Sequence, residues 1–315
     1  MKKISLFTPC YNEEGNLREL YQRVTEVMKL LTQYDYEYVL IDNCSTDGTR
    51  EILRELANED KRVKIIFNMK NFGPSRSGSY GFFNTSGDVS ICFACDFQDP
   101  PELIPEFIKK WEKGSKVVWG RKIGSDEKKG MYAIRCLYYK IIKMISSNEQ
   151  YENVTGFGLY DKEVVELLRK YSGPNPNFRN MVSEFGYKID FVDYHQPVRK
   201  SGKSSYNLAR YFGIAIGDMV STSRLPLRMA TYLGLTVSFF SFIVALIYLI
   251  LKLIFWDSFS FGIAPLVIGM FFIGAIQILF IGIVGEYVGE ILNRLSDRPM
   301  VVEQERLNFD NEESK

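Results

Sequence analysis

The sequence has almost no net charge, a single histidine and few cysteines, and each shortage argues against a class of function. Its 39 lysines and arginines balance 38 aspartates and glutamates, so the basic excess of nucleic-acid-binding proteins is missing and no nucleic-acid partner is expected. The only histidine, His195, lies near Pro197 in a strand-like stretch, where packing or surface exposure is expected rather than base catalysis. Cys92 and Cys95 have the spacing of a metal or redox pair, but in a strand residues three apart face opposite sides.

Charge is also missing from two long runs near the end of the chain. No charged residue lies between Arg228 and Lys252, and none lies between Asp257 and Glu286. Each run exceeds the roughly 20 residues that cross a bilayer core. We therefore expect two transmembrane helices, at about 229–253 and 261–286, rather than two buried helices of a soluble core. The short connection between them predicts a hairpin.

The distribution of basic residues predicts the orientation of this hairpin. Arginines flank its outer ends, whereas the connecting loop has one lysine. These arginines are Arg210, Arg224, Arg228, Arg294 and Arg298. Because basic residues favour the cytoplasmic side, the N-terminal part and both termini are expected in the cytoplasm, with thiols reduced. The apolar run 4–7 is too short for a cleavable signal peptide.

The front of the chain alternates short β-branched runs with helical periodicity, which predicts an α/β fold with a mostly parallel sheet. Strands are expected at 4–8, 36–42, 63–67, 89–94, 112–121 and 187–198, and helices at 14–31, 47–58 and 75–84. Ligands of such sheets bind beyond the carboxyl ends of the strands. Polar groups directly after the strands are therefore the candidate site.

Two polar segments follow predicted strands and carry candidate chemistry. Asp96, Gln98 and Asp99 offer carboxylate and amide oxygens for Mg²⁺ or Mn²⁺, although an acidic turn in which Asp99 caps a helix fits the same residues. Asp42 ends an apolar strand and is a candidate to accept hydrogen bonds from a nucleotide, while Ser45 or Thr46 is expected to cap the next helix.

Five ordered segments resemble a known family. They are 9–14 (PCYNEE), 45–49 (STDGT), 71–73 (NFG), 98–103 (QDPPEL) and 199–206 (RKSGKSSY). Together with the hairpin they resemble family 2 glycosyltransferases of the polyprenyl-phosphate type, such as dolichol-phosphate mannose synthases and bactoprenol glucosyltransferases. The resemblance implies a GT-A fold, a divalent metal, and inverting transfer of a sugar from a UDP-glucose-like or GDP-mannose-like donor to polyprenyl phosphate.

The resemblance also implies roles for individual residues. Asp96 and Gln98 match metal ligands, and Asp96, Arg121 and Arg199 match positions that act in catalysis. The matching substrate-binding positions are Pro9, Tyr11, Asn12, Glu13, Asp42, Asp47, Asn71, Gly73, Lys203 and Ser204. Arg199 and Ser204 belong to a loop that closes over phosphates in the family. A basic loop that contacts lipid headgroups would explain its cations as well.

This sequence departs from the family pattern at four positions. Asn43 and Ala94 stand where the family has acids, and Gly156 and Gly158 stand where it commonly has Asp and Arg. These departures leave open a different membrane lipid as acceptor, or a pseudoenzyme that binds a nucleotide-sugar and acts as a scaffold.

The expected domain organisation has four parts. Residues 1–206 form the cytoplasmic GT-A domain, 207–226 an amphipathic juxtamembrane segment, 227–290 the transmembrane hairpin and 291–315 a cytoplasmic tail. The small residues Gly269, Gly274 and Gly285 could support helix packing, within the hairpin or between subunits of a homo-oligomer.

Overall fold

The structure is a computed structural model that describes residues 1–125, 151, 153–173, 176, 178–197, 225–254, 263–295 and 299–309. The chain divides into two compact units. The α/β unit contains Met1–Lys143, Asn148–Ser205 and Asp297–Lys315, and the helical unit contains Met144–Ser147 and Tyr206–Ser296.

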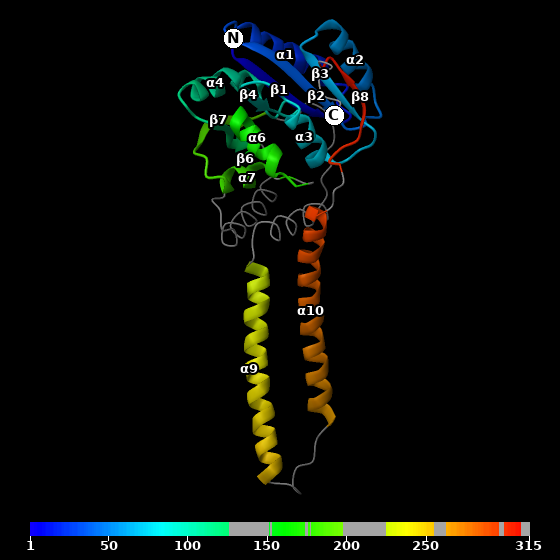
Figure 1. Ribbon diagram of the computed structural model, residues 1–315, viewed down its shortest axis with the longest axis vertical. Coiled ribbons are helices and arrows are strands. Elements are labelled where there is room, and N and C mark those ends of the chain that lie inside the picture. The colour runs from blue at the N-terminus through cyan, green and yellow to red at the C-terminus, as the bar shows by residue number, and fades with distance from the viewer. Residues whose placement is uncertain are drawn as a thin grey trace. The chain divides into compact units, whose positions relative to one another are not determined.

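One eight-stranded sheet organises the α/β unit (Figure 1), with strand order β7-β5-β6-β4-β1-β2-β3-β8. Its strands are β1 (Lys3–Cys10), β2 (Asp35–Asp42), β3 (Val63–Asn68), β4 (Val89–Cys92), β5 (Val117–Ser125), β6 (Val154–Asp161), β7 (Ile189–Gln196) and β8 (Glu303–Leu307). Strands β4, β1, β2 and β3 run parallel, as does the pair β5 and β7, whereas β6 and β8 run antiparallel to their neighbours. The predicted α/β class with a mostly parallel sheet is confirmed.

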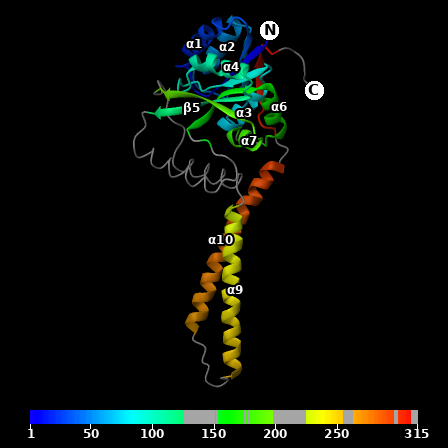
Figure 2. The same ribbon diagram turned by 90° about the vertical axis from the view of Figure 1, so that its left-hand side faces the viewer.

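Helices cover both faces of the sheet, because alternate residues of each strand point to opposite sides. The helices are α1 (Leu17–Lys29), α2 (Thr49–Glu59), α3 (Pro74–Phe83), a 3₁₀ turn η1 (Pro101–Leu103), α4 (Ile104–Glu112), α6 (Lys162–Tyr171) and α7 (Phe178–Glu184). Helices α1, α2 and α4 lie on one face and α3, α6 and α7 on the other (Figures 1 and 2). In β2, Tyr38 and Leu40 pack toward the first layer, and Val39 and Ile41 toward the second.

Strand β8 comes from the far end of the chain. Its residues pair antiparallel with β3 at the edge of the sheet, within the segment for which the sequence predicts only a tail. A second difference lies at residues 112–116, where a strand is predicted. Helix α4 extends to Glu112 instead, and Gly114 (φ 100°) then turns the chain into β5.

The helical unit contains α9 (Leu225–Ile254) and α10 (Ile263–Leu295), both long and apolar enough to cross a membrane. They lie side by side, and a Cβ at Gly234 of α9 would lie 3.3 Å from the Phe280 ring of α10. A Cβ added to any of the glycines expected to support packing would meet no described atom within 4 Å, so contacts between the described parts of the two helices do not use them. They are Gly269, Gly274 and Gly285. The predicted amphipathic segment 207–226 lies outside the described residues, except its last two.

Candidate donor-binding site

Three loops meet at the carboxyl ends of β1, β2 and β4. In the parallel register, Cys10 at the end of β1 is opposite Asp42 at the end of β2, and Phe7 is opposite Cys92 at the end of β4. The first connection along the chain leads from β1 to β2, whereas β4 joins the opposite side of β1. This is the switch in strand order at which open α/β sheets bind ligands.

The loops after β1 and β2 are joined by hydrogen bonds. The Asn12 amide donates to Ser45 Oγ at 2.9 Å, and the Thr46 amide donates to Asn12 Oδ1 at 2.9 Å. The Glu14 amide donates to Asp47 Oδ2 at 3.3 Å. Two of the predicted substrate-binding side chains, those of Asn12 and Asp47, therefore hold the two loops together.

The start of α2 is capped differently from the prediction. Asp47 Oδ1 accepts from the Thr49 amide at 3.1 Å, so Asp47 stabilises the first turn. Ser45 Oγ accepts from the first loop, and the capping role expected of Ser45 or Thr46 is wrong. Two more residues predicted to bind substrate lie in the loop after β1. Tyr11 is exposed, and the Glu13 amide donates to Thr49 Oγ1 at 2.8 Å. Pro9 lies in β1 opposite Ile41.

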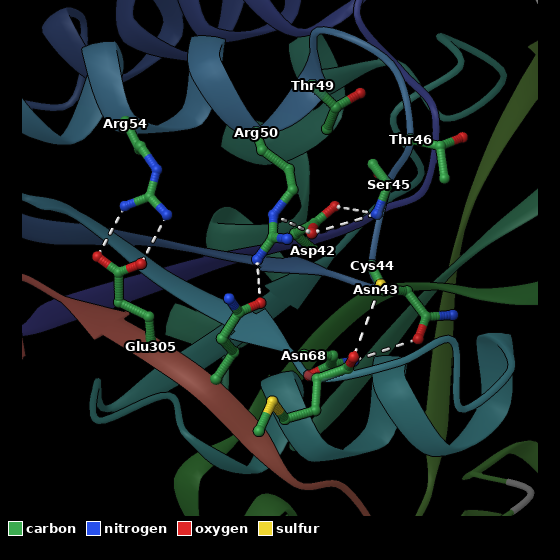
Figure 3. A network of polar contacts seen from close by, with 12 residues as sticks. Asp42, Asn43, Cys44, Ser45, Thr46, Thr49, Arg50, Arg54, Asn68 and Glu305 are labelled. Carbon is green, nitrogen blue, oxygen red and sulfur yellow. Dashed lines mark hydrogen bonds and ion pairs between the residues drawn. The ribbon is translucent and has the colours of Figure 1, made fainter.

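Asp42 is fully buried at the centre of this region (Figure 3). Its two carboxylate oxygens lie 3.1 and 3.3 Å from the Ser45 amide, and Arg50 Nε lies 3.3 Å from Oδ2. Burial raises the pKa of Asp42, because these partners do not fully replace the water that the carboxylate has lost. The raised pKa makes Asp42 a candidate to accept hydrogen bonds from a nucleotide.

Backbone strain gathers at the same edge. Asn12 (φ 56°), Cys44 (φ 63°) and Phe97 (φ 63°) all have left-handed backbone, and each lies in the loop after one of the three strands. Residues other than glycine adopt this conformation rarely, and such residues cluster at ligand-binding and active sites. Two further residues with this conformation, Asn153 and Asn308, lie elsewhere, so the three loops are a candidate functional edge.

An amide network fixes the loop after β3. Asn43 Nδ2 donates to Asn71 Oδ1 at 3.0 Å, and Asn43 Oδ1 accepts from the Phe72 amide at 2.9 Å. The Gly73 amide donates to Asn71 Oδ1 at 2.9 Å, and Asn68 Nδ2 donates to Asn43 Oδ1 at 3.2 Å. Asn43, which departs from the family acid, thus acts as both donor and acceptor. An aspartate could not donate to Asn71.

The loop after β4 contains the predicted metal ligands. Asp96 is buried, and its Oδ1 accepts from the Gln98 amide at 3.2 Å. Asp99 does not cap a helix: its oxygens accept from the Ala94 amide at 3.1 Å and from the Tyr194 hydroxyl at 3.1 Å. Burial raises the pKa of Asp99 to about 6. Asp99 therefore joins this loop to β7.

Among the described residues, no group of three or more His, Cys, Asp and Glu side chains could hold a metal ion by itself. A donor-site Mg²⁺ does not require such a group, because one or two carboxylates, waters and substrate phosphates usually complete its coordination. The buried Asp96 carboxylate beside Gln98 fits that kind of site.

Of the basic residues predicted to act in catalysis, only Arg121 lies among the described residues. Arg121 forms a two-point ion pair with Asp193 of β7, at 2.7 and 3.0 Å. Arg199, Lys203 and Ser204 lie outside the described residues.

The same residues connect the chain to known proteins. The model of glycosyl transferase family 2 matches residues 5–168, which extend from β1 into α6. The chain belongs to glycosyl transferase family 2.

Relatives of this glycosyltransferase match over almost their whole length. An uncharacterised glycosyltransferase of Bacillus subtilis, YkcC, is 33% identical over 311 residues, which are 98% of this chain and 95% of the relative. The bactoprenol glucosyl transferase of Shigella phage SfII is 33% identical over 301 residues, 95% of this chain and 97% of the relative. A solved structure of glucosyl-3-phosphoglycerate synthase from Mycobacterium tuberculosis covers 70% of this chain and 78% of its own, with 16% identity and a TM-score of 0.49.

Two glycines of β6 set this glycosyltransferase apart from the family pattern. A Cβ at Gly158 would lie 2.2 Å from the carbonyl oxygen of Val118, so an arginine cannot fit there without moving β5. Gly156 (φ 92°) has left-handed backbone, and its carbonyl accepts from the Tyr160 hydroxyl at 2.8 Å. The local backbone therefore matches glycine at both positions.

Sequence reasoning missed Arg50 and Tyr194, the residues that contact Asp42 and Asp99. Arg50 carried a weak signal, since it lies in the first turn of the helix that follows Asp42. Tyr194 lies in a strand that was predicted, but nothing local indicates that its hydroxyl reaches the loop after β4.

Proposed function

We propose that this glycosyltransferase moves a sugar, with inversion, from a nucleotide-sugar to polyprenyl phosphate at the cytoplasmic face of a membrane. The observation that carries the proposal is the buried, incompletely compensated Asp42 carboxylate, which shares one sheet edge with Asp96. The acceptor comes from the relatives named bactoprenol glucosyl transferase, which match nearly end to end.

In this proposal, Asp42 accepts hydrogen bonds from the nucleoside of the donor. The loops after β1 and β2 frame that position, because their mutual hydrogen bonds hold the backbone around Asn12 and Ser45 in place. UDP-glucose and GDP-mannose are the two donors to test first.

Asp96 and Gln98 would hold a Mg²⁺ or Mn²⁺ ion together with the donor phosphates. The bound ion would supply neutralisation of the charge that develops on the leaving nucleotide diphosphate. Asp99 positions the loop by its hydrogen bonds to Ala94 and Tyr194, and it does not cap a helix.

The proposed acceptor needs little activation by the protein. A phosphate monoester has a second pKa of about 6, so it is largely dianionic near neutral pH and can act as nucleophile without a general base. This agrees with the exposed position of His195, the only histidine in the sequence. The task of the protein is then to orient the two phosphates and to stabilise the leaving group.

The proposed orientation has both termini in the cytoplasm, with α9 and α10 as a membrane hairpin. Strand β8, which follows α10, belongs to the same sheet as β1. A chain that leaves the α/β unit, crosses a membrane and returns to that sheet must cross an even number of times. Two apolar helices satisfy this condition.

A different membrane lipid is the second candidate acceptor. It is favoured by Gly156 and Gly158, since the polar side chains common at these positions are absent and the second cannot be accommodated.

The test uses purified full-length protein with UDP-glucose or GDP-mannose, Mg²⁺ or Mn²⁺, and either polyprenyl phosphate or a membrane lipid extract freed of it. Mass spectrometry should find a hexose added to polyprenyl phosphate. Product only in the extract would select the second acceptor. The absence of any transferred sugar, with every donor and both acceptors, would reject the proposed reaction.

A further inference from the structure

We infer that β8 is a positioning strap for the donor site, and that Gln304 is a positioning residue that holds Arg50 against Asp42. This inference rests on the proposed role of Asp42 in donor binding. It concerns a contact between two distant parts of the sequence, the first turn of α2 and the strand that follows α10.

An irregularity in β8 directs Gln304 toward α2. Glu305 is opposite Phe67 and Glu303 is opposite Asn68, so Gln304 is an extra residue between two paired positions. Such a bulge breaks the alternation of side chains and re-aims one of them. Gln304 consequently reaches α2 through Arg50. Its neighbour Glu305 reaches the same helix through Arg54 (Figure 3).

Two other side chains of the strand, those of Glu303 and Arg306, lie on the opposite side of the sheet, whereas Leu307 packs on the same side as α2. Arg306 donates to Asn84 Oδ1 at 2.9 Å, at the end of α3, and also pairs with Glu303. The strand therefore has one side directed to the arginines of α2 and another directed to α3. This division supplies a matched control within the same strand.

Arg50 depends on Gln304 for its orientation. Its Nη2 donates to Gln304 Oε1 at 2.7 Å, which is the one hydrogen bond that Arg50 makes among the described residues. Its Nε lies 3.3 Å from Asp42 Oδ2 but is buried without an aligned hydrogen bond. Its guanidinium also lies 4.9 Å from the centre of the Phe67 ring. Without Gln304, the arginine keeps its charge but loses the directional contact that sets its place beside Asp42.

The strap itself is firmly attached. Glu305 accepts two hydrogen bonds from Arg54, at 2.7 and 2.6 Å, and Asn308 Nδ2 donates to the carbonyl oxygens of Ala57 and Val63. Loss of the Gln304 side chain should therefore leave β8 in place. The segment that follows α10 thus supplies a contact to the arginine that lies beside Asp42.

The test measures nucleotide binding by calorimetry to the full-length protein in detergent with Mn²⁺. UDP and GDP are the probes, and the one that binds the wild type is used throughout. Gln304→Ala should weaken binding about threefold to tenfold, the range expected for one ordinary hydrogen bond, because Gln304 acts on Asp42 only through Arg50. Arg306→Gln, on the other side of the strand, should bind as the wild type does.

A double-mutant cycle separates positioning from general loosening of the strand. In an Arg50→Lys background, Gln304→Ala should cause little further loss of affinity, because the guanidinium that Gln304 orients is already absent. Equal affinity of Gln304→Ala and wild type would overturn the inference while leaving the proposed function intact. Additive losses in the cycle, or equal losses in Arg306→Gln, would also overturn it. If neither nucleotide binds the wild type, the proposed function fails and the strap inference fails with it.

Discussion

Two buried carboxylates on the same strand, β2, have pKa values that are shifted in opposite directions. Glu37, in the first half of the strand, accepts from Ser5 Oγ at 2.6 Å and lies 2.8 Å from Lys3 Nζ and 2.9 Å from Lys64 Nζ. These partners outweigh its burial and lower its pKa to about 2. Asp42, at the carboxyl end, has a raised pKa because burial outweighs its partners.

The difference indicates that one end of β2 contributes to stability, whereas its other end belongs to the proposed donor site. Glu37 is saturated by protein groups, so its charge has no further partner to gain and serves the fold. At the edge proposed to bind the donor, burial outweighs the partners of Asp42, so a ligand that donates to it would stabilise its charge. Substitutions at the two ends of the sheet should therefore have different effects, and the largest is expected at Glu37.

Glu37→Gln should destabilise the fold by about 3–5 kcal/mol, the cost of leaving buried or partly buried cations without their partner. The measurement is thermal or denaturant unfolding, with UDP binding as the second readout, which should stay unchanged in the folded variant.

The pH dependence of that loss has a definite sign. The pKa of Glu37 falls from 4.5 to about 2 on folding, so its stabilisation is present above pH 4.5 and is lost as the pH falls toward 2. The difference between wild type and Glu37→Gln should therefore shrink on acidification through this window. A difference that stayed constant from pH 7 to pH 3 would contradict the assignment.

Asp96→Ala tests the functional edge by activity. Turnover should fall about 100-fold or more, roughly 2.7 kcal/mol, because the only carboxylate proposed to hold the metal is removed. Gln98→Ala should also lower turnover strongly, and excess chelator should abolish it. Asp88→Asn, at the opposite end of β4 where Asp88 accepts from the Lys3 amide, is the matched control and should remain active. Full activity of Asp96→Ala or in chelator would exclude the metal role.

Asn43→Asp should have the smallest effect, a loss of about 1–2 kcal/mol of stability. The change removes the hydrogen bond to Asn71 and adds a second carboxylate beside Asp42. Unfolding measurements at pH 7 and pH 4 report it, and the loss should be smaller at pH 4, where the new acid is partly protonated. Unchanged stability at both values would show that the amide network does not need a donor at this position.

The sequence predicted the elements whose signals are local. Strands β1 to β4 and helices α1 to α3 have period-2 or helical apolar patterns, and their positions match the predictions within a few residues. Both long apolar helices were also predicted, because their composition alone identifies them. The loops after β2 and β4 were also correctly predicted to open onto the same edge of the sheet.

Helix α6 was missed although its amphipathic pattern is local, whereas other parts that escaped prediction depend on distant contacts. Strand β8 has the sequence EQERL, whose polar residues gain strand structure only by pairing with β3 and with the arginines of α2. The sequence left the role of Asp99 open, because a carboxylate before a helix looks the same whether it caps that helix or bonds to another strand. The role of Asn43 could not be predicted either, because it depends on a hydrogen bond to Asn71 in the loop after the next strand.

The most direct test of the contrast is Asp42→Asn, measured in the presence of Mn²⁺ for unfolding free energy and for affinity toward UDP or GDP, whichever binds the wild type. The account predicts at least about a tenfold loss of nucleotide affinity, about 1.4 kcal/mol, with stability unchanged or slightly increased, because a poorly compensated buried charge has been removed. If Asp42→Asn instead lost stability as Glu37→Gln does and bound that nucleotide as tightly as the wild type, Asp42 would be a structural acid and the donor site would lie elsewhere.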